Sequence, residues 1–428
     1  MPRHSGSLAK PVAAPWCHSV IAVVALLSAI VRSMPGQAPV ESTATAAAAL
    51  ALSLSDGRTL VASRLEGTRE NGFAATVDGR VERLSRGDLV AVHGVAVQPL
   101  DLAAAWLPAG EVVRGTLTGG DPAGDTLTIL SPVLGSVELA VDRLAAFVPA
   151  GGASPRLEPA ALPLPTGVDE ALFVHARIGY DLLAGSLHRF TPQGVRFATS
   201  GNETAKAYGK NEFVALRIGD PAPREEPPVA TLLTRTGDRL GVGAVVFTAE
   251  GVRCELENGA VAALRVGDLA CLSFRGPWTY LSDLEPTAVD ETGFEGPVLL
   301  PYRRDAAVAG GALVAADRTH GKGLGVHSRS RLTFTVPPGA ASFWTRVALD
   351  DSAAALPLRP DVDVRVVHGG VVAFERRGLE PGGEPADTGL LPVSPGATLI
   401  LEVDFGKGRE LGDRVDWLTP IFLPSPAR

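Results

Sequence analysis

The sequence predicts an all-β protein in which tandem small β-barrel repeats precede a C-terminal β-sandwich. Glycine (48) and proline (34) are frequent while aromatic residues make up only 5%, a composition typical of short strands joined by tight turns. Apolar and polar residues alternate over many short runs, as strands with one buried face require. A small pattern of such runs recurs between residues 50 and 274, and 428 residues exceed one ordinary core.

The N-terminus has the pattern of a secretory signal peptide, assigned to residues 1–38. Basic positions near the start precede an apolar run over residues 20–31. At about a dozen residues this run falls short of the roughly 20 that a bilayer-spanning helix needs. We therefore expect cleavage near Ala38, no stable membrane insertion afterwards, and a protein that is secreted, periplasmic or at the cell surface. An uncleaved anchor formed by a short tilted helix is the alternative.

The charge of the chain argues against a nucleic-acid partner. The formal net charge is −8, and no run of basic residues occurs in the sequence. Phosphate binding depends on clustered Lys and Arg, so no nucleic-acid contact is predicted.

Two of the three cysteines, Cys254 and Cys271, lie outside the predicted signal peptide. Isolated cysteines in strands are commonly buried as small apolar side chains, which is the interpretation we favour. A disulfide between the two is the alternative in an oxidising compartment. Neither a C-x-x-C motif nor a zinc-ligand spacing occurs.

Four degenerate copies of a small β unit are predicted upstream of the C-terminal domain. The clearest match aligns Val81–Val92 with Val261–Leu272 without gaps, and hairpin turns at Asp78–Gly79 and Asn258–Gly259 precede the two stretches. The copies are assigned to residues 45–100, 110–150, 171–220 and 229–276, with a proline-rich linker at 151–170.

The strand spacing of these copies resembles that of small SH3-like or Sm-like barrels. Each copy is too small to bury a good core alone, so we expect the copies to close into small barrels or to pack in pairs. Helix is expected to be minor, with Leu100–Leu107 as the one short candidate. Gly276–Trp278 leads almost directly into the C-terminal domain, so the fourth copy and that domain are expected to share an interface.

Two stretches organise the C-terminal domain, assigned to residues 280–428. The first, Gly321–Arg331, reads Gly-Lys-Gly-Leu-Gly-Val-His-Ser-Arg-Ser-Arg and precedes the alternating run Leu332–Val336. Glycines at that spacing predict a strand where backbone approaches backbone too closely for a Cβ, or where φ is positive. The second stretch is Gly412–Trp417, near the C-terminus.

This domain resembles the NPCBM family of carbohydrate-binding modules, which often accompany glycoside hydrolases in secreted bacterial proteins. The resemblance rests on Tyr302–Asp305 with Gly310–Gly311, Gly323–Ser328, Val347–Ser352, Leu399–Val403 with Asp404, and Gly412–Trp417, in the family's order. It implies a jelly-roll-like sandwich that binds galactose-type or related glycans and is not catalytic. Tyr302, Ala348 and Arg414 depart from the residues common in the family, which leaves the glycan preference open.

Candidate carbohydrate-binding residues are His327, Arg329, Trp344, Asp351 and Asp416. His327 and Arg329 have the same parity, so an extended strand would point both to one side, where they would orient sugar hydroxyls through hydrogen bonds. Trp344 is expected to face outward and to stack on a sugar ring if its neighbours face the core.

Structural roles stay open for the same residues. His327 is equally explained as a histidine bonded to a carboxylate such as Asp351, and Trp344 as a cover over the interface with the fourth copy. Asp416 is favoured as a structural residue that fixes a turn beside a buried tryptophan. Calcium is the one cofactor considered: clustered carboxylates, Asp350 and Asp351 with Asp413 or Asp416, would supply oxygen ligands, although no calcium-loop signature accompanies them.

The sequence as a whole favours an exported, non-catalytic protein that binds a glycan or polysaccharide. A structural or assembly protein of the cell envelope, partnered by other envelope proteins, is the alternative, and an accessory part of a glycoside hydrolase system is a second. Catalysis is disfavoured because the aspartates lie at strand ends, and neither a Gly-x-Ser-x-Gly elbow nor a catalytic-barrel pattern occurs.

Overall fold

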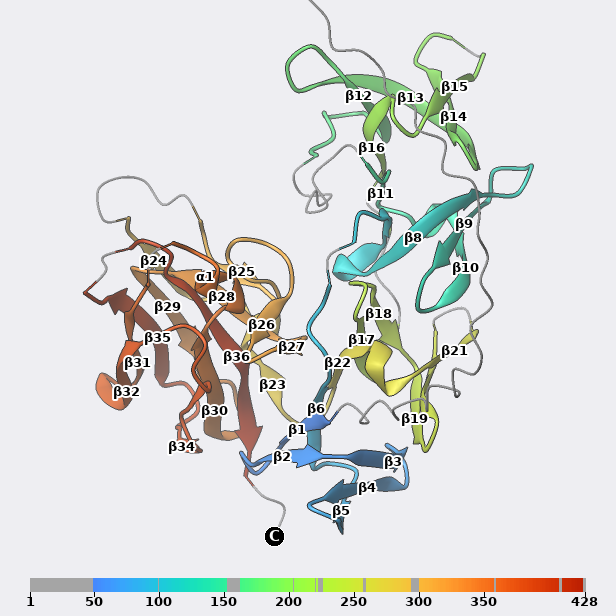
Figure 1. Ribbon diagram of the computed structural model, residues 1–428. Helices are drawn as coiled ribbons and strands as arrows, with labels where there is room; N and C mark the ends of the chain where they lie inside the picture. Colours follow the sequence, from blue (N-terminus) through green and yellow to red (C-terminus); the bar gives the residue numbers. More distant parts are fainter. Residues whose placement is uncertain are drawn as a thin grey trace, which may run out of the picture. The chain divides into compact units, whose positions relative to one another are not determined.

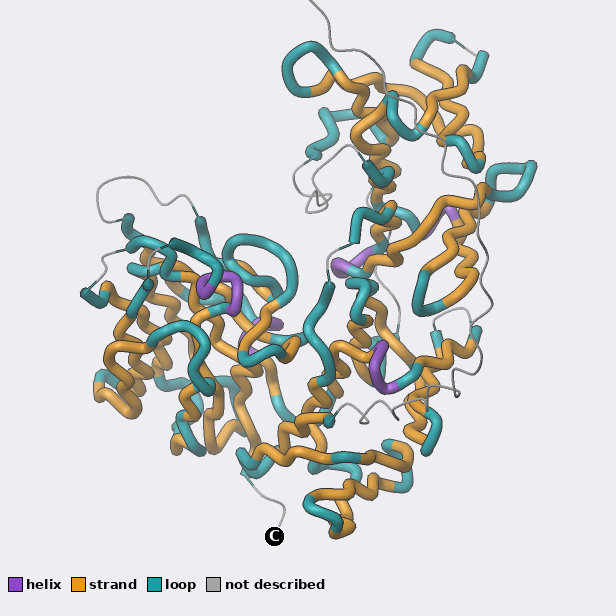
Figure 2. Tube along the Cα trace, viewed as in Figure 1, coloured by secondary structure: helices purple, strands orange, loops and turns teal. Residues whose placement is uncertain are grey.

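The computed structural model describes residues 49–98, 100–151, 162–202, 204–219, 221, 226–256, 259–293, 300–357, 359–407 and 410–425. These residues form antiparallel sheets with very little helix, which confirms the predicted all-β class (Figures 1 and 2). The predicted signal peptide, most of the proline-rich linker and Asn258 lie outside this range. No helix in the described part of the chain is long and apolar enough to cross a membrane.

The described strands between residues 50 and 274 are grouped here by the four predicted segments, which keep the name copies. Copy 1 comprises β1 (Leu50–Leu54), β2 (Thr59–Ala62), β3 (Arg64–Thr68), β4 (Gly72–Val77), β5 (Arg80–Leu84) and β6 (Leu89–His93). Copy 2 comprises β7 (Ala103–Trp106), β8 (Val112–Gly119), β9 (Thr126–Ser131), β10 (Gly135–Ala140) and β11 (Ala146–Val148). Copy 3 comprises β12 (Glu170–His175), β13 (Tyr180–Thr191), β14 (Gly194–Thr199), β15 (Lys206–Gly209) and β16 (Phe213–Ile218). Copy 4 comprises β17 (Ala230–Thr234), β18 (Arg239–Val242), β19 (Ala244–Thr248), β20 (Gly251–Glu255), β21 (Val261–Leu264) and β22 (Leu269–Phe274).

Copies 1 and 4 pair as equivalents. β6 pairs β22 with Val92 opposite Leu272, which are matched residues in the gapless alignment. β3 pairs β19 with Gly67 opposite Phe247, and each is the fourth residue of its strand. Each copy thus presents the same edge to the other, as subunits do in a two-fold dimer. Because the two copies share sheets and one core, separate tandem SH3-like or Sm-like barrels are not confirmed.

Copies 2 and 3 pair through their last strands as well, β11 against β16. The segment Leu100–Leu107, predicted as a short helix, contains strand β7 instead. β7 is hydrogen-bonded on both sides, to β8 and to β11, and its alanines are buried. Sheet pairing and burial therefore override the helix propensity of alanine in this segment.

The C-terminal domain is a β-sandwich whose two sheets enclose an apolar core. The first sheet contains β23 (Thr279–Tyr280), β25 (Arg303–Arg304), β28 (Gly323–His327), β36 (Arg414–Pro424), β30 (Ala340–Leu349), β33 (Ala386–Asp387) and β34 (Leu391–Pro392). The second contains β24 (Ala288–Glu291), β29 (Ser330–Thr335), β35 (Thr398–Phe405), β31 (Val362–His368) and β32 (Val371–Leu379). A hairpin of β26 (Leu313–Ala315) and β27 (Arg318–His320) and the short helix α1 (Asp351–Ala354) lie beside it (Figure 1). Short 3-10 turns are η1 (Pro108–Gly110), η2 (Val141–Arg143), η4 (Val266–Asp268) and η5 (Leu281–Asp283).

The face of the first sheet that points away from the sandwich core packs against copies 1 and 4. The module side chains in this shared core are Trp278, Tyr280, Trp344, Ile421 and Leu423. Polar contacts accompany the apolar ones: His93 Nδ1 lies 3.0 Å from the Thr319 carbonyl oxygen, and Arg239 donates to Asp305 over 2.9 Å. We call this contact the junction. It includes the predicted interface with the fourth copy and extends it to the first.

The structure also places the two cysteines. Cys254 and Cys271 are both free and buried, at 0% exposure each. Burial raises the pKa of the Cys254 thiol to about 12, so this side chain behaves as a small apolar group. The interpretation as buried, unpaired cysteines is confirmed.

Candidate functional site

The glycines of the first organising stretch let β28 pass close to its neighbours. A Cβ on Gly323 would lie 2.5 Å from the Trp417 carbonyl oxygen, and one on Gly325 would lie 2.4 Å from the Ala306 carbonyl oxygen. Neither glycine has a positive φ. Close approach is therefore the reason for glycine at both positions. It brings β28 between β25 and β36 and fixes where the strand ends.

β28 ends at His327 at one end of the sandwich, where the chain crosses to the second sheet. His327 pairs with Arg414 at the start of β36, and the Arg414 guanidinium donates to the Ser352 hydroxyl over 3.0 Å. At the same end of the second sheet, Arg329, just before β29, places its Nε 3.9 Å from Asp404 Oδ1 near the end of β35. We call these five residues the open-end cluster.

The open-end cluster is accessible to solvent. The Arg329 side chain is 58% exposed and that of Asp404 is 34% exposed, while Ser352 is exposed and both His327 and Arg414 are half-buried. The cluster therefore combines two guanidinium groups, an imidazole, a hydroxyl and a carboxylate. Such groups form short, oriented hydrogen bonds with hydroxyl-rich ligands.

The prediction that His327 and Arg329 lie on one strand and point to the same side is only partly right. The two residues do not belong to one continuous strand, because β28 ends at His327 and β29 begins at Ser330. They nevertheless stay at the same end of the sandwich. The His327 ring contacts the Ser328 carbonyl oxygen at 2.7 Å, so the structure does not show the proposed bond to Asp351.

The outward, sugar-stacking orientation predicted for Trp344 is wrong. Trp344 does point away from the sandwich core, but it is 0% exposed because the junction covers it. Its indole nitrogen donates to Asp387 over 3.0 Å, and a Cβ on Gly57 of copy 1 would lie 3.5 Å from its Cδ1. The alternative role as an interface cover fits this placement.

Of the two predicted aspartates of the site, Asp351 holds a turn, whereas Asp416 lies inside strand β36 and does not fix the turn that its predicted structural role required. Asp416 is 0% exposed, and burial followed by the neighbouring Asp350 carboxyl raises its pKa well above the usual range. Asp351 accepts hydrogen bonds from the backbone nitrogens of Ala316 (3.0 Å) and Asp317 (2.8 Å), which hold the β26–β27 turn. Burial raises the pKa of Asp351 as well. Neither carboxyl lies among the groups of the open-end cluster.

The carboxylates do not form the calcium site considered from the sequence. Among the described residues, no group of three or more His, Cys, Asp or Glu side chains is placed to hold a metal ion. Asp413 is instead bonded by the Ser328 hydroxyl, and burial raises its pKa to about 7. The donor set therefore does not fit calcium here.

Sequence reasoning did not assign three members of the cluster, Arg414, Ser352 and Asp404, to the binding site. Arg414 was visible only as a departure from the family pattern, and Ser352 and Asp404 only as members of two stretches that carry the family resemblance. The pairing of β28 with β36 brings Arg414 beside His327, and the N-terminal turn of α1 brings Ser352 to it. The tryptophans described in the module, Trp278, Trp344 and Trp417, are all buried, so tryptophan stacking does not contribute at this end.

Comparisons with known proteins agree with the fold of this region. The model of the NPCBM/NEW2 domain matches residues 278–423, which include both sheets of the sandwich. A search among curated proteins gave no match.

Several solved structures are similar at low identity. One is a CBM51 module from Clostridium perfringens GH95 in complex with methyl-galactose, at 18% identity and TM-score 0.30, covering 34% of this chain and 99% of that one. Another is CBM51-2 in complex with GlcNAc, with INT domains, from Clostridium perfringens ZmpB, at 21% identity and TM-score 0.30, covering 43% and 37%. A third is the pair of tandem CBM51 modules of a family 98 glycoside hydrolase from Streptococcus pneumoniae, at 12% identity and TM-score 0.30, covering 88% of each chain. Because these scores are low, the domain assignment rests on the family model.

Proposed function

We propose that the NPCBM/NEW2 domain at residues 278–423 is a carbohydrate-binding module that contacts its glycan through the open-end cluster. The observation that carries this proposal is the gathering of guanidinium donors from both sheets, the exposed Arg329 from one and the half-buried Arg414 from the other, at one end of a sandwich that matches the family model. The opposite possibility, binding across the first sheet, conflicts with its burial in the junction.

The chemistry of the cluster indicates how a sugar would be held. Guanidinium groups donate pairs of hydrogen bonds to vicinal hydroxyls, and the half-buried imidazole of His327 and the Ser352 hydroxyl add shorter-range selectivity. Since the described tryptophans are buried, recognition depends on hydrogen bonds more than on stacking by tryptophan. We infer galactose-type or related glycans from the family resemblance, and an exported location from the N-terminal pattern.

The test uses the full chain on a glycan array. An isolated 280–428 segment would expose Trp344, Ile421 and Leu423, which are buried only with copies 1 and 4 present, and such a patch promotes non-specific association. We expect binding to at least one glycan by the full chain and at least a tenfold loss with Arg414→Ala. Arg377→Ala is the matched control, because its side chain is 71% exposed on β32 in the second sheet. The absence of binding to every glycan would contradict the proposal.

A structural or assembly role is the second candidate, and the junction favours it. The module uses part of one sheet face to join copies 1 and 4, as a packing unit would. Under this alternative the array shows no glycan, and mutations in the junction, but not those in the open-end cluster, abolish association with envelope partners.

A further inference from the structure

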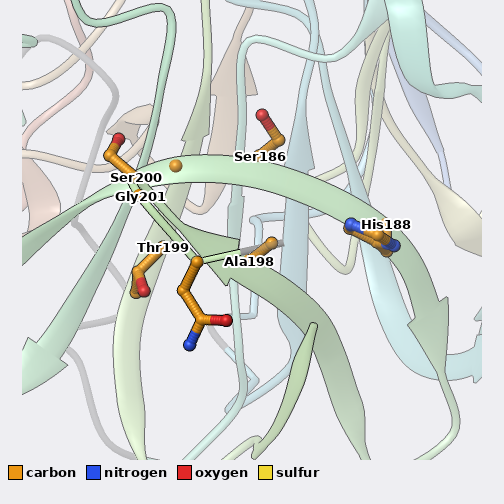
Figure 3. Close-up of a pocket in the computed structure, with 8 residues that line it drawn as sticks. Ser186, His188, Ala198, Thr199, Ser200 and Gly201 are labelled. Carbon is orange, nitrogen blue, oxygen red and sulfur yellow. The ribbon is translucent and has the colours of Figure 1, made fainter. Parts of the chain in front are cut away.

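Copy 3 carries a surface hollow that lies outside the module altogether. It has a volume of about 580 Å³, within the range of about 300–1,000 Å³ typical of small-ligand sites. Its walls are β13, β14 and the turn that follows β14 (Figure 3). The lining residues are Gly185, Ser186, His188, Ala198, Thr199, Ser200, Gly201 and Asn202.

Copy 2 provides an internal comparison for this hollow. Its β8 residues Gly115–Thr118 match Gly185–His188 of copy 3, and in both copies a Cβ on the glycine would lie within 2.4 Å of a carbonyl oxygen of the paired strand. Thr116 pairs with Leu130 in copy 2, while Ser186 pairs with Ala198 in copy 3. Leu130 carries a large side chain that is 51% exposed, and copy 3 has only a methyl group there. The exchange of leucine for alanine opens space at this point.

The turn after β14 supplies a second difference. In copy 2, residues 132–134 join β9 to β10, whereas in copy 3 the longer segment 200–205 joins β14 to β15. This segment brings the Ser200 hydroxyl and the Asn202 amide to the hollow. The Asn202 side-chain oxygen accepts from the Thr204 nitrogen over 3.0 Å, which holds the amide in place. Loops positioned on a rigid sheet in this way commonly carry binding residues.

A β-bulge fixes His188 at the rim of the hollow. The register of β13 with β14 shifts between Leu187 and Arg189, which makes His188 the extra residue. The Leu187 nitrogen donates to the Glu170 carboxylate, and a Cβ on Gly124 of copy 2 would lie 2.0 Å from the His188 carbonyl oxygen. The bulge is therefore held from two sides, and bulges re-aim side chains beside binding sites.

The bulged residue has a different fate in copy 2. There it is Thr118, whose hydroxyl donates to the Thr128 carbonyl oxygen over 3.0 Å and so satisfies the backbone. Copy 3 places an exposed imidazole at the same bulge. At this position copy 3 therefore offers a hydrogen-bonding side chain, His188, to the solvent, and copy 2 does not.

We propose that the copy 3 hollow is a second ligand site, which binds a neutral sugar unit independently of the C-terminal module. Hydroxyl, amide and imidazole groups line it, and none of the lining residues that the structure describes is Lys, Arg, Asp or Glu. Such a lining disfavours phosphate and other charged ligands, and the small apolar surface disfavours lipophilic ones. A polyhydroxylated ring satisfies these donors and acceptors in the space available.

The test is saturation-transfer NMR on the full chain with methyl β-galactoside, methyl β-glucoside and methyl β-N-acetylglucosaminide. All variants carry Arg329→Ala and Arg414→Ala, so that a signal from the module cannot stand in for the hollow. Ser186→Trp fills the hollow, and Thr116→Trp is the matched control because it is the equivalent exposed position of copy 2. Asn202→Ala removes one amide from an exposed turn.

We expect saturation transfer to at least one glycoside in this background. The signal should fall at least tenfold with Ser186→Trp, fall measurably with Asn202→Ala and persist with Thr116→Trp. Absence of transfer to all three glycosides overturns the proposal, as does a signal that survives Ser186→Trp or disappears equally with Thr116→Trp. The saturation-transfer result does not depend on the outcome of the glycan array, because all variants used here already lack Arg329 and Arg414 of the open-end cluster.

Discussion

The junction and the open end of the C-terminal sandwich lie at opposite ends of one short stretch, residues 318–329, and serve opposite purposes. At the junction, residues before β28 contact copies 1 and 4: the Arg318 guanidinium donates to the Ala49 carbonyl oxygen, Thr319 contacts His93, and the Gly321 carbonyl oxygen accepts from Arg239. At the other end of β28, His327 and Arg329 meet solvent and polar neighbours. One short stretch therefore anchors the module at one end and presents its polar site at the other. Mutations near the junction should lower stability, and mutations near the open end should weaken glycan binding.

The largest effect is expected between these two ends, at Gly325. A valine there would place its Cβ 2.4 Å from the Ala306 carbonyl oxygen and 2.5 Å from the Val308 nitrogen, and both are backbone atoms that cannot move away. Gly325→Val should therefore unfold the C-terminal domain, because the clash with backbone cannot be relieved as an overpacked side chain, at about 1–3 kcal/mol, can be. Gly243→Val is the control, since nothing lies within 4 Å of its added Cβ. Equal melting temperatures for both variants would sink this account of β28.

The next largest effect is expected at the junction. Trp344→Ala removes a fully buried side chain from the core shared with copies 1 and 4 and should cost about 3–5 kcal/mol in urea unfolding. Amide hydrogen exchange in β1 of copy 1 should speed up in the same variant. Unchanged exchange in β1 would show that Trp344 does not couple the two regions.

A smaller effect concerns pH at the junction. Burial lowers the pKa of His93 to about 4, with Arg346 and Arg318 opposing its protonation and the Thr319 carbonyl oxygen favouring it, while the His320 ring lies 4.2 Å away. A histidine whose folded pKa lies below its unfolded value contributes stability above about pH 6.5, and this stability is lost as the pH falls towards 4. We expect a loss of up to about 3 kcal/mol over that window, reduced in His93→Gln. A stability that is flat from pH 6.5 to 4 would contradict this.

At the open end the pH effect has the opposite sign. Burial raises the pKa of Asp413 from 3.8 to about 7, so the folded state holds a proton that the unfolded state releases. Stability should therefore decline as the pH rises from about 4 to about 7, and Asp413→Asn should weaken that decline. Chemical unfolding at pH 5 and pH 8 checks it; an unchanged slope in the variant would rule out Asp413 as the cause.

Sequence reasoning predicted the local features of the fold. Alternation along Leu332–Val336 marks a strand that is hydrogen-bonded in the second sheet, and the glycines of β28 lie where backbone crowds backbone. These features depend on neighbours along the chain, which the sequence displays directly. The alignment of copy 1 with copy 4 predicted their likeness but not that they pair with each other, because that pairing joins residues about 180 positions apart.

The site was predicted less completely for the same reason. Parity along β30 correctly turns Trp344 away from the sandwich core, but whether solvent or copy 1 covers that face is decided by distant segments. His327 and Arg329 came from a local motif, whereas Arg414 and Ser352 reach them only through strand pairing and a helix turn. Leu100–Leu107 was mispredicted for the same reason. Its alanines are in a strand because β8 and β11 pair with it on both sides, and the local sequence does not reveal these partners.

The most direct measurement is calorimetric affinity for a glycan found on the array, compared between Arg329→Ala and Trp344→Phe. The account predicts that Arg329→Ala weakens binding at least tenfold with a melting temperature unchanged, since the Arg329 side chain is 58% exposed. Trp344→Phe should lower the melting temperature and leave the affinity unchanged. The reverse pattern, with affinity lost in Trp344→Phe and kept in Arg329→Ala, would contradict the assignment of binding to the open end.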